Sequence, residues 1–149
     1  MIPTRLLRVA FAVLAGLTVP ALAMPTADGT ATLTVTIRGV LPQPSQLLLG
    51  VFTAAEYEEK ISPIHQSAEA MAPETVVTFE ALTPGRVAVK VLQDLNGNWK
   101  MDKTLIGVPE EPFGLSNDAR PSMGLPGFDE TGFDLHPGPN TIVITLQEM

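Results

Sequence analysis

The sequence contains no cysteine and only two histidines, and these two absences limit the kinds of site it can hold. Without cysteine, no disulfide supports the fold, although this does not argue against export. His65 and His136 stand alone, each beside or near a proline in a predicted loop. A transition-metal centre requires clustered imidazole or thiolate ligands, so the sequence gives no indication of one.

Basic residues are also scarce. The chain has 9 Lys and Arg against 16 Asp and Glu, a formal net charge of −7. This excess of negative charge disfavours nucleic acids and anionic membrane surfaces as partners. It is compatible with cation binding, and equally with a charge that keeps the protein in solution.

The first 23 residues have the order of a secretory signal peptide. Arg5 and Arg8 form a short basic region, an apolar run covers 6–19, and the small-x-small segment 21–23 follows. The apolar run is shorter than the ~20 residues that span a bilayer. We therefore predict a signal peptide at 1–23 and export to the periplasm or beyond. The mature chain would carry no membrane span, and loss of the two arginines would bring its net charge to −9.

Helical periodicity is scarce in the remaining chain, whereas strand alternation is common. In 31–39, Leu33, Val35 and Ile37 face one way and polar residues the other, as in a half-buried strand. A more continuous apolar run predicts a second, more fully buried strand at 46–54. Alternation predicts a hairpin of two strands joined at 83–85, and another hairpin in 127–147 closes the chain. One short helix is expected at 54–60, followed by loop. The pattern predicts an all-β chain with one domain at 24–149. Its fold would be a single antiparallel β-sandwich, Ig-like or transthyretin-like, of about seven strands with one long functional loop.

That long loop begins with oxygen-bearing residues at every second position, a spacing that suits a hard cation. The proposed calcium ligands are Asp94, Asn96, Asn98, Lys100 through its carbonyl, Asp102, and Glu111 from further along the loop. The match to an EF-hand fails at Trp99 and Leu105, where that motif requires glycine and glutamate. The alternative is a tight turn in which Asp and Asn accept hydrogen bonds from nearby backbone amides and Gly97 takes a positive φ.

The second half of the loop, 107–118, is rich in glycine and proline. Here and beside it we predict binding residues, because exposed aromatic and polar groups together can hold a sugar or a protein. These residues are Trp99, Glu110, Phe113, Ser116 and Asn117. Trp99 and Phe113 have an alternative role as a cover over the end of the core. No complete catalytic motif is present, since Ser116 lies outside a Gly-x-Ser-x-Gly elbow.

Segment 85–118 resembles a bacterial family of exported proteins, the domain of unknown function 2141. That family combines D-x-N-x-N-x-K-x-D with G-x-P-x-E-P-x-G-x-S-N. The matching residues are Asp94, Asn96, Asn98, Lys100, Asp102, Gly107, Pro109, Glu111, Pro112, Gly114, Ser116 and Asn117. The family commonly has glycine where this chain has Trp99, which raises the question of whether the loop closes. The resemblance implies export and a β-sandwich related to transthyretin-like or surface-protein B-type domains, without an established activity.

Three functions are compatible with these observations. The first is a non-catalytic binding or structural module that recognises a cell-envelope protein or glycan, with calcium ordering the loop. The second is a periplasmic glycan hydrolase with Glu110 or Glu111 as acid and Asp94 or Asp102 as base. The third is a loop that only stabilises the fold.

Overall fold

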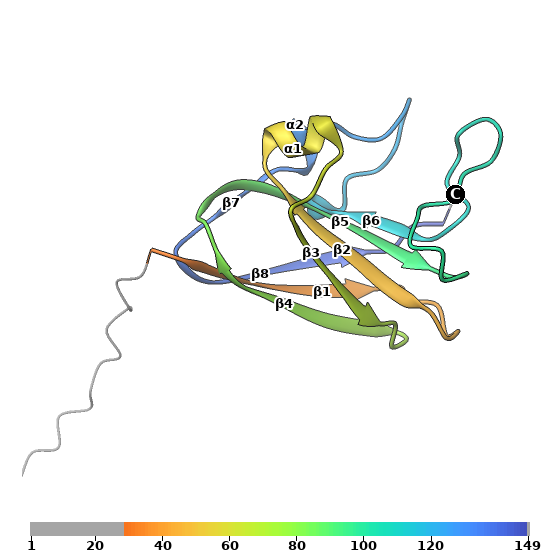
Figure 1. The fold of residues 1–149 in the computed structure, drawn as a ribbon, viewed down its shortest axis with the longest axis horizontal. Coiled ribbons are helices and arrows are strands. Elements are labelled where there is room, and N and C mark those ends of the chain that lie inside the picture. The colour runs from red at the N-terminus through yellow and green to blue at the C-terminus, as the bar shows by residue number, and fades with distance from the viewer. Residues whose placement is uncertain (1–28, 149) are drawn as a thin grey trace, which may run out of the picture.

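A computed structural model describes residues 29–148, which form eight strands in two sheets (Figure 1). The fold is therefore mostly β, as the alternating pattern predicted. The predicted signal peptide at 1–23 lies outside the described residues.

The smaller sheet has three strands in the order β4-β1-β8. These strands are β1 (Ala31–Arg38), β4 (Glu74–Leu82) and β8 (Gly138–Thr145). β1 is antiparallel to β4 and parallel to β8. Its alternating Val, Ile and Thr residues suit a half-buried strand, because branched side chains pack well on a pleated surface.

The larger sheet has five strands, four of them in the order β3-β2-β5-β6. They are β2 (Gln46–Phe52), β3 (Ile64–Glu69), β5 (Gly85–Asp94) and β6 (Phe113–Leu115). The fifth strand, β7 (Phe133–Leu135), pairs with the beginning of β5. All pairings in this sheet are antiparallel.

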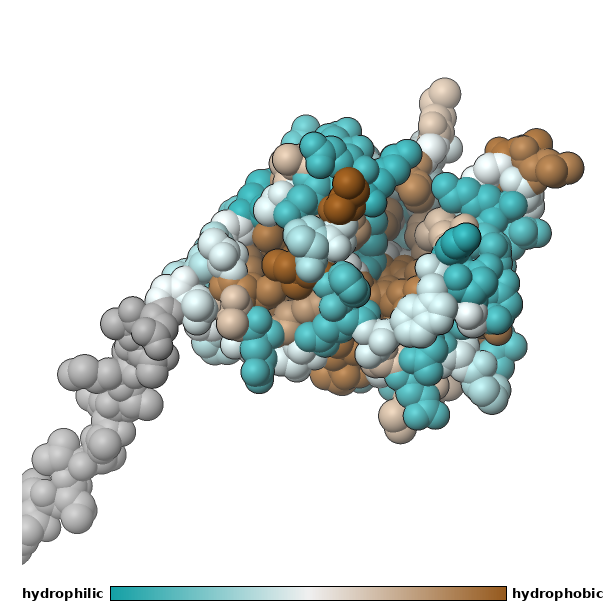
Figure 2. All heavy atoms as spheres, viewed as in Figure 1, coloured by the Kyte–Doolittle hydropathy of each residue, from teal (hydrophilic) through white to brown (hydrophobic). Residues whose placement is uncertain are grey.

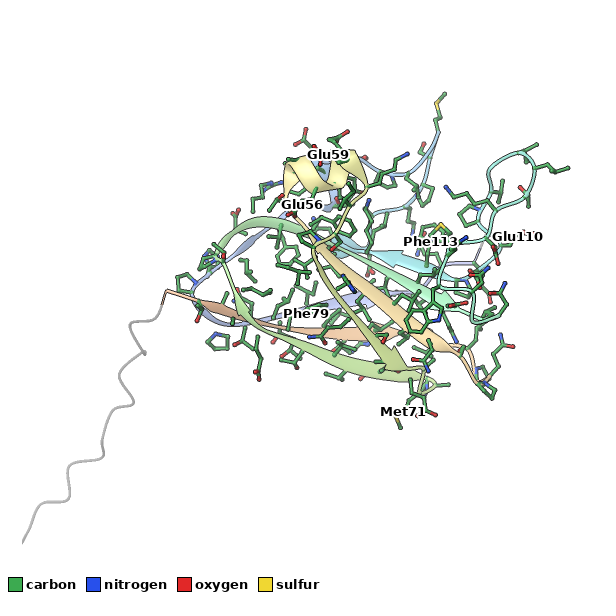
Figure 3. All side chains as sticks on the ribbon, viewed as in Figure 1. Glu56, Glu59, Met71, Phe79, Glu110 and Phe113 are labelled. Carbon is green, nitrogen blue, oxygen red and sulfur yellow. The ribbon has the colours of Figure 1, made fainter. Side chains whose placement is uncertain are left out.

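One hydrophobic cluster takes side chains from both sheets. Phe79 of β4 lies in it between the sheets (Figure 3), and so do the inward residues of the neighbouring strands. They include Leu33, Val35, Ile37, Leu47, Leu49, Val51, Val87, Val89, Val91 and Ile144. The period-two alternation of β1, β2, β4 and β5 thus gives each of these strands one core face.

Two short helices and one 3₁₀ turn lie outside the sheets. Helix α1 (Ala54–Glu59) follows β2, and helix α2 (Phe128–Thr131) precedes β7. The 3₁₀ turn η1 (Ser116–Asp118) follows β6. Within 29–148, no helix has the length and apolar character needed to cross a membrane.

The structure corrects four expectations about the strands. The segment after α1 forms β3 rather than loop, and β6 lies inside the stretch expected to lack strands, so eight strands replace about seven. Neither expected hairpin forms, because β4 and β5 lie in different sheets, as do β7 and β8. The first and last strands pair in parallel, so the fold is not purely antiparallel.

Candidate functional site

The predicted site is a loop of residues 95–112 that leaves β5 and returns as the adjacent strand β6. Leu92 of β5 pairs with Phe113 of β6, so the two ends of the loop are held side by side. The backbone N–H of Gln93 also donates to the carbonyl of Pro112 at 2.8 Å. The sheet therefore fixes the base of the loop, and the rest of its shape comes from its own hydrogen bonds.

Asp94 organises the first turn of this loop. Its side chain is buried at the end of β5, with 1% of its surface exposed. Oδ1 accepts the backbone N–H of Gly97 and Oδ2 that of Trp99, both at 2.8 Å. Gly97 and Trp99 both have positive φ, +74° and +62°. The loop therefore closes with tryptophan in the left-handed region that usually favours glycine.

The next polar residues continue this network. Asn96 Oδ1 accepts the backbone N–H of Asn98 at 3.1 Å, and Asn98 Oδ1 accepts that of Lys100 at 2.9 Å. Both asparagine amide groups donate to the carboxylate of Asp102, Asn98 at 2.8 and 3.0 Å to its two oxygens. This is the turn of Asp and Asn side chains on backbone amides that the sequence offered as the alternative to a metal loop.

Glu111 joins the two halves of the loop. Its side chain is buried, and it accepts the backbone N–H groups of Leu95 at 2.9 Å and Asp102 at 3.3 Å. Glu110 beside it is exposed on the outer side of the loop (Figure 3). The adjacent glutamates therefore have different environments, and neither faces the other.

The fit to calcium depends on these hydrogen bonds. Calcium takes oxygen ligands, but both asparagines direct amide nitrogen at Asp102, and Asp94 is engaged by backbone N–H groups. An ion would have to displace the amide groups from Asp102 and turn oxygen toward itself. Within 29–148, no three His, Cys, Asp or Glu residues are grouped as metal ligands. The loop is thus closed by hydrogen bonds among its polar groups, and calcium would require its asparagine and aspartate side chains to rearrange.

The glycan hydrolase alternative gains no support from the carboxylates. Glu111 and Asp94 both have their oxygens engaged by backbone N–H groups, and Glu110 is exposed. A general acid needs a proton to give and a cleft that alters its pKa. The hydrolase stays a prediction.

Beyond Asp102 the chain forms a small projecting hairpin, 103–109. Lys103 and Pro109 form an isolated bridge, and the N–H of Thr104 donates to the carbonyl of Val108 at 2.8 Å. Leu105 and Ile106 occupy the tip and are almost wholly exposed. Figure 2 shows apolar spheres at the end of this projection.

Two of the five predicted binding residues, Phe113 and Ser116, are buried and fix the structure. Phe113 is 1% exposed and packs with Leu92 and Leu115, which agrees with its alternative buried role and not with an exposed binding residue. Ser116 is fully buried; its hydroxyl donates to the carbonyl of Thr131 at 2.6 Å and accepts the N–H of Val89 at 2.9 Å.

Asn117 has a similar positioning role. Its amide donates to the carbonyls of Glu130 and Gly132, both at 3.1 Å, which attaches helix α2 to η1. Its φ of +62° is one that asparagine tolerates better than most residues. The G-x-P-x-E-P-x-G-x-S-N segment therefore connects the loop, β5 and α2, and Trp99 remains as the exposed aromatic of the predicted set.

A pocket that the sequence analysis did not identify lies on the outer face of the larger sheet. Its volume is about 340 Å³, and Figure 2 shows it as a hollow with apolar surface between α1 and the 95–112 loop. It is lined from four segments: Leu48, Gly50 and Phe52 of β2, His65 and Ser67 of β3, Lys90 and Leu92 of β5, and Trp99 and Met101 of the loop.

Lys90 is the one lysine of this lining. Its Nζ lies 3.5 Å from the ring centroid of Tyr57 and 4.6 Å from that of Phe52. Burial lowers the pKa of Lys90, and nearby Lys60 lowers it further, whereas Glu58 acts in the opposite direction. From sequence, Lys90 is only an outward residue of an alternating strand. The sequence pattern does not indicate that helix α1 places the ring of Tyr57 over the Lys90 amine.

Comparison with known proteins identifies one family. The family model described as "Uncharacterized protein conserved in bacteria (DUF2141)" matches residues 35–143, from β1 to β8. No curated protein and no solved structure matches the chain.

Proposed function

We propose that this chain, which belongs to that bacterial family, is an exported, non-catalytic module that binds a protein of the cell envelope through its loop end. Export is supported by the order of basic, apolar and small residues in 1–23. The fold we propose is a β-sandwich of the transthyretin-like or Ig-like kind. Two sheets that share one hydrophobic cluster support it.

The observation that carries the proposal is a firmly held loop with apolar side chains in solvent. Trp99 is 62% exposed and Ile106 87% exposed, although the turns that bear them are closed by hydrogen bonds. Met123 and Leu125 of the neighbouring 120–126 segment are exposed as well. A pocket of about 230 Å³ lies between this segment and the 103–109 hairpin, with Ile106 and Leu125 in its lining. Single exposed apolar residues are ordinary, but a group of them on one end of a protein marks an interaction surface.

The chemistry of this surface favours a protein partner over a glycan. Apart from Trp99, its exposed apolar groups are aliphatic or thioether side chains, which pack against other apolar side chains. Sugar recognition relies on aromatic planes, and within 29–148 Trp99 is the one exposed aromatic residue. Glycan binding is thus an alternative outcome of the test below.

The test is photo-crosslinking from the tip of the loop. A photoreactive residue at Leu105 is expected to give a discrete protein adduct in the envelope of cells that make the protein. The same residue at Val76, an exposed apolar position on β4, should give none. Absence of an adduct from position 105, or equal adducts from both positions, would exclude the protein-binding surface. Co-sedimentation with purified cell-wall glycan, lost on Trp99→Ala, would replace it with the glycan alternative.

Calcium enters this proposal as an ion that would hold the loop in place of part of its hydrogen bonds, once the amide groups of Asn96 and Asn98 turn away from Asp102. Three carboxylates of the loop, Asp94, Asp102 and Glu111, belong to one hydrogen-bonded network with two asparagines. Thermal melts in chelator, in millimolar calcium and in millimolar magnesium test it, with Asp102→Asn as the variant. Calcium at a hundred times its dissociation constant raises the free energy of unfolding by about 2.7 kcal/mol. A melting temperature that calcium does not change would exclude calcium from the proposal, and the proposed partner surface would not depend on that result.

A further inference from the structure

We propose that the pocket on the outer face of the larger sheet binds a small amphipathic anion. The charged head of this ligand would lie against Lys90, and its apolar body against Leu48, Leu92 and Trp99. This site goes beyond the proposed partner surface and does not depend on it, because its lining shares no residue with the pocket beside the 103–109 hairpin; Trp99 alone belongs to both surfaces.

The charged end of the site is the amine of Lys90. Tyr57 and Phe52 lie within cation–π range of it. Within 29–148, the two pairs of oppositely charged side chains in salt-bridge range are Arg38–Glu74 and Arg86–Asp134, so no carboxylate lies within 4.0 Å of Lys90. A half-buried cation without a counterion beside it gains most from an anion that arrives with the ligand.

The apolar end comes from the pairing of two strands. Leu48 of β2 lies opposite Leu92 of β5, and Gly50 lies opposite Lys90. Because Gly50 has no side chain, no atoms project from the sheet at that position, and the space beside the Lys90 amine stays open. A Cβ at this position would come within 2.8 Å of the Phe52 ring. The larger sheet therefore supplies an apolar floor that leads directly to a single positive charge.

Size and charge together define the ligand class. The volume of about 340 Å³ falls in the range of roughly 300–1,000 Å³ that is typical of small-molecule sites. The titratable residue in the lining besides Lys90 is His65. Lys60 and Glu58 act on Lys90 in opposite directions, and the effect of Lys60 is the larger of the two. A cationic ligand would meet Lys90 unfavourably, and a neutral one would leave the amine without a counterion.

Two fluorescent probes with the same aromatic body separate these possibilities. One is 8-anilino-1-naphthalenesulfonate, which is an anion, and the other is N-phenyl-1-naphthylamine, which lacks the sulfonate and is neutral. Both are titrated against the purified protein at neutral pH. We expect the anion to bind at least tenfold more tightly than the neutral probe. Equal affinities, or no binding of either probe at millimolar protein, would overturn the proposal.

Three variants locate the binding. Lys90→Met keeps an unbranched side chain and should abolish the preference for the anion, with little change for the neutral probe. Trp99→Ala should weaken both probes by a similar factor and keep the preference. Lys103→Met removes an exposed lysine from the hairpin, outside the pocket, and should change neither. An anion preference that survives in Lys90→Met, or that disappears in Lys103→Met, would exclude this site. Circular dichroism of each variant verifies that it is folded.

Discussion

At the scale of single residues, Asp94 determines the shape of the loop. It is buried and accepts two backbone N–H groups, one from each residue with positive φ in the turn. Asp94→Ala removes both acceptors and leaves those donors unpaired at the end of β5. Hydrogen bonds to a charged group contribute about 1.5–3 kcal/mol each, so we expect the free energy of unfolding to fall by about 3 kcal/mol. Urea denaturation measures this.

The control for Asp94 is another aspartate with weaker contacts. Asp134 is exposed and lies 3.9 Å from Arg86 in a solvated ion pair, so Asp134→Ala should have little effect on the urea midpoint. Asp94→Asn retains one acceptor oxygen and should fall between the two. If Asp94→Ala unfolds no earlier than Asp134→Ala, the loop does not depend on this carboxylate.

The side chain of Trp99 is exposed, but its backbone has a conformation that is unfavourable for a non-glycine residue. Its φ of +62° costs a non-glycine residue roughly 1–2 kcal/mol. Trp99→Gly removes this strain but increases the freedom of the unfolded chain, which offsets about 0.5–1 kcal/mol. The free energy of unfolding should therefore stay the same or rise by up to about 1 kcal/mol.

Two comparisons test the interpretation of Trp99 in the same urea experiment. Trp99→Val keeps the cost of the positive φ and adds the extra strain of a β-branched residue in the left-handed region, so it should lower stability below that of the natural chain. Val76→Gly lies in strand β4 and should also lower it, by about 1 kcal/mol. A clear loss of stability in Trp99→Gly would mean that the indole packs against the protein.

At the scale of elements, the short strand β6 depends on a glycine. A Cβ on Gly114 would lie 2.5 Å from Cγ2 of Ile144 and 3.2 Å from the carbonyl oxygen of Thr145, both in β8. Gly114→Ala must therefore push β6 away from β8. Overpacking of this kind costs about 1–3 kcal/mol, to be read from thermal melts. Gly29→Ala, where a Cβ meets nothing within 4 Å, should leave the melting temperature unchanged.

The elements also show what the sequence could and could not reveal. Alternation is a local property, and it predicts β1, β4, β5 and β8, with Leu33, Val35 and Ile37 as the clearest case. Strand β2 is predicted by its continuous apolar run, which is local as well. Strand β3 has no such alternation, since its residues are almost all exposed, and it exists because β2 offers it an edge. The two hairpins were predicted from turn residues, which report that the chain bends but not which sheet the next strand joins.

The loop was predicted from the same kind of local evidence. Asp and Asn residues next to Gly97 indicate a hydrogen-bonded turn, and the sequence analysis included this turn as the alternative to a metal loop. The pocket around Lys90 could not be predicted, because its walls come from β2, β3, β5 and the loop. Such a site depends on tertiary packing, which leaves no periodic trace in the sequence.

At the scale of the whole molecule, the loop and the sheets should unfold together. Phe113 and the hydrogen bond from Gln93 to Pro112 connect the loop to the larger sheet, and one cluster connects that sheet to the smaller one. Trp99 is the sole tryptophan, so its fluorescence reports on the loop, whereas far-UV circular dichroism reports on the sheets. In urea the two signals should change with one midpoint. A fluorescence change well before the loss of dichroism would show that the loop opens independently.

Because β1 and β8 pair in parallel, both strands begin at the same end of the molecule and both end near the loop. Ala31 lies beside Gly138 at one end, and Gln147 lies beside Phe113 at the end that carries the loop. Figure 1 shows the start of β1 far from the 95–112 loop. A tether, tag or solid support attached ahead of residue 29 would therefore leave the 95–112 loop pointing away from the attachment and accessible to a binding partner. The same attachment after residue 148 would lie at the loop end and would obstruct the 95–112 loop. For biosensor immobilisation or display, the amino-terminal side is the one to use.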